Sequence, residues 1–235
     1  LFQQGDEFIP RRIKKEKPIL NLTTHNLLGL SAPLIQALGE KLTIIEVVRH
    51  PLYMLKQQVL YKNSLHMELR DFDLFFNYKG QPIPYFAYCW EDLFLKSNTM
   101  EKTVYCIQKM TELVEQNKLI LTDRYKTNII TIPFEQFVLN PSPFMEIITS
   151  TLKTKAVKLT NKVMKKQKIP RKMIGAGLDL EIYKRCGWEP PKSNDEKEEM
   201  KIKREYARQS LNSKSLETLD QLSSNYERKF LANIL

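Results

Sequence analysis

Glycine is scarce in this chain, with 7 residues among 235. A loop that cradles phosphate on backbone N–H groups needs glycine beside Lys and Ser or Thr, between a strand and a helix. None of Gly5, Gly29, Gly39 and Gly80 lies in such a run. Residues 1–235 therefore contain no recognisable glycine-rich phosphate loop.

Sulfur and imidazole ligands are few as well. The three cysteines are widely spaced and form no Cys-x-x-Cys pair (Cys89, Cys106 and Cys186), which argues against a disulfide framework and against a zinc site. The three histidines leave little material for a multi-histidine metal site (His25, His50 and His66). We predict reduced structural thiols and no bound metal.

Long apolar runs are missing too. No stretch approaches the roughly 20 apolar residues of a membrane helix, and no signal peptide is visible. We predict no membrane segment in this chain and a cytoplasmic location. The 42% of hydrophobic residues is nevertheless enough for the core of one α/β domain.

Positive charge, by contrast, is abundant. The formal net charge is +10 and the isoelectric point is near 9.4. The dense basic segments are residues 11–15 and 162–172, with a smaller pair at 184–185. Each can be an ordinary solvated surface, or it can bind a polyanion such as nucleic acid, glycan or nucleotide.

The most informative segment is an apolar, β-branched run at residues 42–48 that ends on Arg49, His50 and Pro51. A buried parallel strand has this composition, and its carboxyl end opens into the ligand crevice of an α/β sheet. Pro51 suits the first turn of a following helix. Arg49 therefore lies where a phosphate would bind, and its guanidinium offers a bidentate fork. The alternative is a salt bridge at the strand end; His50 is interpreted as structural.

Three segments in order support a family resemblance. Residues 19–25 read ILNLTTH and end in Thr-His, the run at 42–48 ends in Arg-His-Pro, and residues 129–141 read IITIPFEQFVLNP. In order and spacing, the chain resembles the C-terminal portion of the sulfotransferases that use 3′-phosphoadenosine 5′-phosphosulfate (PAPS). The resemblance covers about residues 17–175.

The resemblance implies a role for five residues. Arg49 would bind the 3′-phosphate of PAPS. Arg171 and Lys172 fall where the family has a basic segment that closes over this phosphate, and Gln57 takes the place of a serine that donates to it. His25 is the candidate catalytic base, because imidazole titrates near neutrality. The alternatives for His25 are a structural role at the strand end, with an upstream carboxylate as the base.

The chain also departs from the family. The Lys-Ser-Gly-Thr loop that binds the phosphosulfate is absent, and Phe134 and Gln136 replace the Tyr and Asp of a Tyr-Glu-Asp motif. Only Glu135 is kept there, and we interpret it as structural. We expect the chain to be the C-terminal part of a longer protein whose first strand and loop precede Leu1, and we expect this part alone to be inactive.

The alternation of strand and helix patterns predicts an α/β fold. With the resemblance, it implies a three-layer sandwich in which helices flank a mainly parallel sheet, the P-loop NTPase-like fold of sulfotransferases. We predict one domain, 1–235, with a connector at 1–17, an α/β body at 18–192 and C-terminal helices at 193–235. The expected strands are 19–24, 42–48 and 129–133, and the expected helices are 32–38, 51–69, 85–95, 100–116, one from 142, 195–211 and 215–231. The aromatic-rich residues 71–82 form a loop or short hairpin that either lines an acceptor pocket or fills the core.

The predicted function is transfer of a sulfuryl group from PAPS to a hydroxyl or amine, on a carbohydrate or small molecule. The expected partners are PAPS and its product 3′,5′-ADP, without nucleic acid. One alternative is a nucleotide kinase-like phosphotransferase, which would need the absent loop and acidic magnesium ligands. Another is a basic nucleic-acid-binding protein, which would interleave aromatic and cationic residues. Here the aromatic residues cluster at 72–90 and the cations lie elsewhere.

Overall fold

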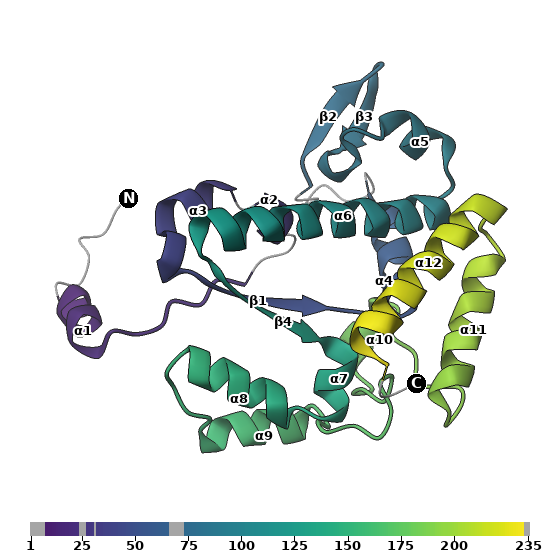
Figure 1. The fold of residues 1–235 in the computed structure, drawn as a ribbon. Helices are drawn as coiled ribbons and strands as arrows, with labels where there is room; N and C mark the ends of the chain where they lie inside the picture. Colours follow the sequence, from purple (N-terminus) through teal and green to yellow (C-terminus); the bar gives the residue numbers. More distant parts are fainter. Residues whose placement is uncertain (1–7, 24–26, 31, 66–72, 233–235) are drawn as a thin grey trace.

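The computed structural model describes residues 8–23, 27–30, 32–65 and 73–232 (Figure 1). The strands are β1 (Thr43–Val48), β2 (Phe75–Tyr78), β3 (Gln81–Pro84) and β4 (Asn128–Pro133). The helices before β4 are α1 (Phe8–Glu16), α2 (Leu27–Leu30), α3 (Ala32–Leu38), α4 (Pro51–Ser64), α5 (Glu91–Lys96) and α6 (Thr99–Tyr125), with short 3-10 turns η1 (Gly39–Lys41) and η2 (Tyr85–Ala87). Those after it are α7 (Phe134–Leu139), α8 (Ser142–Thr151), α9 (Lys158–Lys166), α10 (Glu181–Arg185), α11 (Glu196–Arg208) and α12 (Ser213–Phe230).

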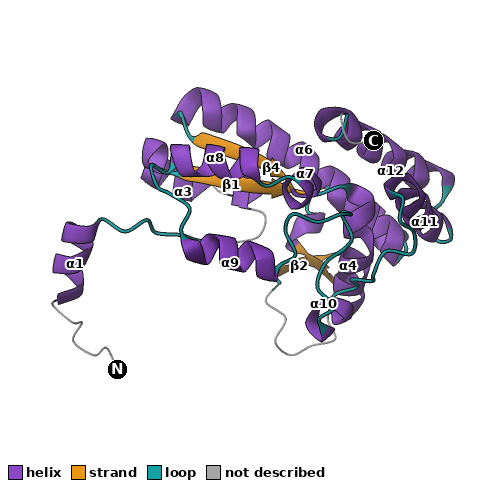
Figure 2. Cartoon of the chain, turned by 90° about the horizontal axis from the view of Figure 1, so that it is seen from below, coloured by secondary structure: helices purple, strands orange, loops and turns teal. Residues whose placement is uncertain are grey.

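The centre of the fold is a parallel pair of strands, β1 and β4. Their register runs from Thr43 opposite Asn128 to Val48 opposite Pro133, so both strands end at the same edge. Figure 1 shows α3 and α6 on one side of the strands and α8 and α9 on the other. Seen from below in Figure 2, α8 lies across β4, which it contacts. The structure is thus a mixed α/β fold with a small parallel sheet between helices.

The predicted strand at residues 19–24 is wrong for residues 19–23, which form no regular structure. Thr24 lies outside the described residues. Ile19, Leu20 and Leu22 are exposed, so apolar side chains alone did not bring this segment to a sheet edge. A strand needs a hydrogen-bonding partner, and in the part of the chain that the structure describes β1 pairs only with β4.

Within the predicted connector at 1–17, the described residues include a helix. Residues Phe8–Glu16 form α1, which buries none of its side chains. Pro10 near the start of this segment is compatible with a first helical turn. An isolated helix of this length needs packing or charge effects to persist in water.

One face of β1 is uncovered. Val47 points to the same side of the sheet as its partner Ile132, yet Val47 is 61% exposed and Ile132 only 4%. Ile45 is likewise exposed beside the buried Ile130. The continuous apolar run predicted a strand buried on both faces. In the structure, the sheet face on the α8 side is covered over β4 but exposed over β1.

Helix α6 is longer than the predicted helix at 100–116. It begins with a capping box, in which Asn98 Oδ1 accepts from Glu101 N–H and the Glu101 carboxylate accepts from Asn98 N–H, both at 3.0 Å. Asn117, where the sequence pattern weakened, continues the helix and donates to the Leu28 and Gly29 carbonyls. The extension is therefore supported by a tertiary contact that periodicity does not show.

One apolar cluster packs α2, α3 and α6 on β1 through Leu28, Ile35, Ile44 and Leu121, and two more clusters complete the core of the described residues. The C-terminal helices α11 and α12, predicted at 195–211 and 215–231, pack on α4 and α6 in a cluster that includes Leu55, Val104 and Leu219. The β2–β3 hairpin and α5 form a second cluster with Phe86 and Trp90 buried. The predicted hairpin is confirmed, and Phe86, Trp90 and Phe94 after it are core, whereas Tyr88 is exposed.

Two further properties concern the described ranges. No helix there is both long and apolar enough to cross a membrane. Cys89, Cys106 and Cys186 are free thiols, and Cys106 is buried.

Candidate functional site: a cationic pocket at the strand ends

Three segments that are distant in the sequence meet where β1 and β4 end. Arg49 follows β1 directly, and Phe134 begins α7 directly after β4. The third is the segment around Arg171, whose backbone N–H donates to the Val138 carbonyl at 2.7 Å. Its guanidinium also donates from Nη1 to the Ile174 carbonyl at 3.0 Å. The backbone bond therefore fixes Arg171 to the end of α7.

The ring of Phe134 contacts the guanidinium groups of both Arg49 and Arg171. The Cζ of Arg49 lies 4.9 Å from the centre of the Phe134 ring, and the Cζ of Arg171 lies 5.6 Å from it. Both distances fall within the range of cation–π contacts. The Nε atoms of the two arginines are buried and have no hydrogen-bond partner among the described residues. Buried donors are normally satisfied, so these two are free for an acceptor.

The electrostatics favour an anion there. Burial lowers the pKa of Arg49, and the Glu135 carboxylate opposes this shift. Burial also lowers the pKa of Arg171, and the charge of Arg49 lowers it further. Both shifts mean that the folded protein disfavours the charged forms. Among the described residues, no carboxylate forms an ion pair with either arginine. A bound anion would therefore compensate the two like charges.

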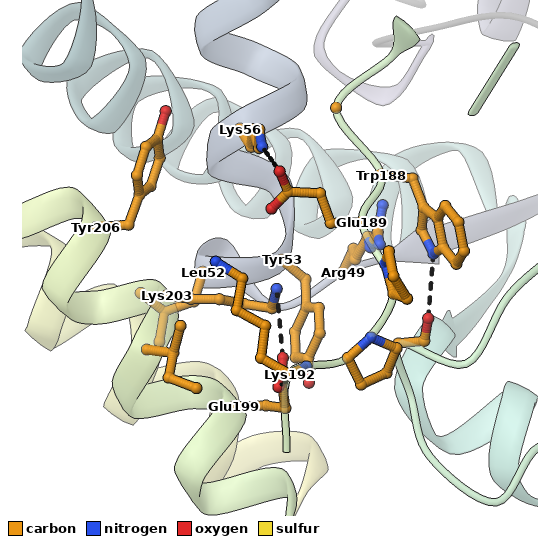
Figure 3. A pocket seen from close by; sticks show the side chains of 15 residues that line it. Arg49, Leu52, Tyr53, Lys56, Trp188, Glu189, Lys192, Glu199, Lys203 and Tyr206 are labelled. Atoms are coloured by element: carbon orange, nitrogen blue, oxygen red, sulfur yellow. Dashed lines mark hydrogen bonds and ion pairs between the residues drawn. The ribbon is translucent and has the colours of Figure 1, made fainter. Parts of the chain in front are cut away.

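A cavity of about 120 Å³ opens beside Arg49 (Figure 3). Its wall comes from α4, from residues 187–192 and from α11. Pockets that hold whole drug-sized ligands measure about 300 to 1,000 Å³. This cavity therefore suits one phosphate-sized group rather than a complete nucleotide.

Cations outnumber carboxylates in the wall: Arg49, Lys56, Lys192 and Lys203 face Glu189 and Glu199. Lys56 and Glu189 form a close ion pair. Lys203 lies 3.9 Å from Glu199 and 4.9 Å from the centre of the Tyr53 ring. Burial lowers the pKa of Lys203, and Arg49 is among the neighbours that lower it further. The wall thus keeps an excess of positive charge.

Hydrogen bonds fasten the segment that closes the cavity. Glu199 accepts from Ser193 N–H at 2.6 Å and from Lys192 N–H, which ties residues 192–193 to α11. Tyr53 O–H donates to Glu196 at 2.7 Å, and Trp188 Nε1–H donates to the Gly175 carbonyl at 3.1 Å. Figure 3 shows Trp188 and Tyr53 lining the wall. The pocket is therefore preorganised by the fold.

No protein-family model, no curated protein and no solved structure matches this chain. Its site is consequently interpreted from its own geometry. Among the residues that the structure describes, no group of three or more His, Cys, Asp or Glu side chains could hold a metal ion.

The structure brings together two of the five residues singled out from the sequence, Arg49 and Arg171. Gln57 and Lys172 are exposed and lie outside the cavity wall. Gln57 is on α4 and Lys172 directly follows Arg171, but neither side chain is part of the cluster. His25 lies outside the described residues.

Sequence reasoning missed Tyr53, Lys56, Lys192 and Lys203. For Lys56 a signal was present, because residues three and four apart share a helix face and Lys56 follows Tyr53 and Leu52 at these spacings. Lys203 and Lys192 carry no such signal, since Lys203 reaches the cavity through the packing of α11 against α4, and Lys192 lies in the segment before α11 that its backbone N–H ties to Glu199.

His50 is fully buried and begins α4 as its N-cap. Its Nδ1 accepts from Leu52 N–H at 3.2 Å, so the ring proton is on Nε2, which donates to Glu227 at 3.1 Å. Burial lowers the pKa of His50. The imidazole is thus a neutral cap, in line with the structural role expected for it.

We expect this cap to make the fold sensitive to mild acid. Unfolded histidine titrates near pH 6.5, and the folded pKa is lower, so the unfolded state takes up the proton first. The contribution of His50 to the free energy of unfolding should therefore be constant above about pH 7 and decrease as the pH falls toward 5. His50→Asn keeps a cap acceptor and should lose this part of the pH dependence. Urea unfolding at several pH values measures it, and equal slopes for both proteins would contradict the assignment.

Proposed function

We propose that this chain belongs to a PAPS-dependent sulfotransferase and that Arg49 and Arg171 bind the 3′-phosphate. The main support for the proposal is that both arginines, which lie 122 positions apart in the sequence, contact Phe134 with unpaired buried Nε atoms. Guanidinium forks are suited to bidentate phosphate binding. Arg49, though not Arg171, also lines the small cavity, which suits one phosphate group.

In this proposal, the bound PAPS supplies an activated sulfuryl group, which an acceptor hydroxyl or amine attacks as 3′,5′-ADP leaves. Arg49 and Arg171 hold the 3′-phosphate and so position the donor, an effect that contributes much of the rate in comparable group transfers. Lys56 and Lys203 add positive charge to the same wall. His25 stays the candidate that takes the acceptor proton, and a carbohydrate or small molecule stays the candidate acceptor.

Residues 1–235 contain no glycine-rich loop for the phosphosulfate. Because that group needs a nest of backbone N–H donors, we expect these residues to bind 3′,5′-ADP without transferring sulfuryl groups. Nucleotide binding, rather than turnover, is therefore the property to measure first.

Calorimetric titration with 3′,5′-ADP and with 5′-ADP at equal ionic strength tests the proposal. We expect 3′,5′-ADP to bind at least tenfold tighter, because a charge-assisted hydrogen bond contributes about 1.5 to 3 kcal/mol. A chelator should leave this preference unchanged. Lys172→Ala, which removes an exposed neighbouring cation, is the matched control and should keep most of the preference.

Three results would refute the proposal. Equal affinity for the two nucleotides would show that the site does not recognise the 3′-phosphate. Magnesium-dependent binding of ATP with no 3′-phosphate preference would favour the kinase-like phosphotransferase. Tight binding of nucleic acid alone would favour the basic nucleic-acid-binding protein.

A further inference from the structure

Helix α9 is a basic amphipathic helix that lies on the surface. It buries none of its residues, and Leu159 and Val163, four positions apart on one face, are 65% and 49% exposed. Lys162 and Lys166 form the neighbouring row at the same spacing. Met164 and Thr160, about 100° around the helix on the other flank of the apolar pair, are half-buried. The apolar pair therefore faces solvent and is bordered by lysines.

Helix α1 repeats this arrangement independently. Ile9 and Ile13, again four positions apart, are exposed, and no residue of the helix is buried. Arg11, Arg12, Lys14 and Lys15 surround them, with Glu16 paired to Arg12. Each of the two helices thus presents a pair of exposed aliphatic side chains next to clustered cations.

The charge around α9 is of one sign. From Lys153 to Lys172 the chain has nine cationic residues, and no Asp or Glu occurs between Glu146 and Asp179. Among the described residues, no salt bridge involves any lysine from Lys153 to Lys168. Figure 1 shows α8 and α9 together at one end of the molecule, away from α11 and α12. These cations are therefore not neutralised within the fold.

An anionic lipid surface complements both parts of this pattern. A helix with an apolar stripe and a cationic face lies in the membrane interface, where the stripe enters the acyl boundary and the lysines reach the head groups. A soluble polyanion would satisfy the lysines but would leave Leu159 and Val163 in water. We propose that α9, together with α1, docks this protein on membranes that contain anionic lipids. The proposal does not depend on the sulfotransferase function.

Co-sedimentation with vesicles tests the proposal at physiological ionic strength. Wild-type protein should bind vesicles of phosphatidylcholine with phosphatidylserine and not vesicles of phosphatidylcholine alone. Lys162→Glu with Lys166→Glu should weaken binding by at least about thirtyfold, since each lysine near an anionic surface contributes roughly a factor of five. Leu159→Ser with Val163→Ser should weaken it about tenfold or more through the lost apolar burial. Ile9→Ser with Ile13→Ser should also weaken it, to a degree that measures the share of α1.

The matched charge control is Lys197→Glu with Lys201→Glu on the exposed side of α11, which should bind nearly as the wild type does. Circular dichroism and thermal melting verify that each variant folds, as expected for positions that bury nothing.

Three outcomes would overturn the proposal. One is no binding to anionic vesicles. Another is unchanged vesicle binding by the Leu159→Ser, Val163→Ser variant, because a purely electrostatic surface would then suffice. The third is a wild-type dimer in light scattering that this variant abolishes, because a second copy would then cover the apolar stripe.

Discussion

Replacing Arg49 with methionine is expected to weaken the binding of 3′,5′-ADP by about 100-fold, because two charge-assisted hydrogen bonds of a bidentate fork are lost. The same change should leave the ligand-free protein as stable as before, or more stable. Arg49 has a buried Nε without a partner, and burial lowers its pKa more than Glu135 restores it. A guanidinium held in this way costs folding free energy, which an apolar side chain of similar length avoids.

Unchanged or greater stability combined with lost nucleotide binding distinguishes a ligand-binding residue from a structural one. Calorimetry gives the affinity, and urea unfolding without nucleotide gives the stability. Arg208→Met, at an exposed arginine of α11, is the matched control and should change neither. A clear loss of stability in Arg49→Met would identify Arg49 as a structural residue. An equal loss of affinity for 5′-ADP would contradict its role toward the 3′-phosphate.

Replacing Glu135 with alanine should destabilise the fold by about 3 kcal/mol, since each buried group left without its partner costs about 1 to 3 kcal/mol. Glu135 is fully buried and joins two parts of the structure. Its Oε1 accepts from His50 N–H at 3.0 Å, and its Oε2 accepts from Tyr226 O–H. The first bond fixes the turn after β1, and the second fixes α12 to the same place.

Conservative variants make the Glu135 prediction specific. Glu135→Gln keeps an acceptor for His50 N–H and should cost much less than the alanine change. Tyr226→Phe removes only the hydroxyl, which also lies 3.3 Å from the Val48 carbonyl, and should cost about 1 kcal/mol. Chemical unfolding of the three variants provides the comparison, and similar losses for alanine and glutamine would contradict the two-bond account. Because the carboxylate attracts Arg49, Glu135→Gln should not weaken nucleotide binding.

Several features followed from local rules. The β-branched runs at 42–48 and 129–133 predicted β1 and β4, since such side chains favour strands, and His50-Pro51 predicted the start of α4. Parallel strands present their carboxyl ends at one edge, so the position of Arg49 beside Phe134 was also accessible once both strands were placed.

The failures share a cause. Residues 19–23 have strand-like apolar character but no partner strand, and Val47 has the composition of a buried position but no covering helix. Propensity describes what a residue tolerates, whereas pairing and burial depend on what lies next to it. Lys172 and Gln57 likewise fall near the site in sequence, yet both are exposed and neither lines the cavity.

By itself, the sequence determined the excess of positive charge, the lack of a glycine-rich phosphate loop, the α/β alternation and the arginine at a strand end, because each depends on composition or on neighbouring residues. Only the tertiary structure decided that Arg171 joins Arg49 on Phe134, that Lys203 reaches the same cavity, and that the apolar stripes of α1 and α9 stay uncovered. These features arise from contacts between distant segments, and their energies depend on burial and on charges that no local pattern contains.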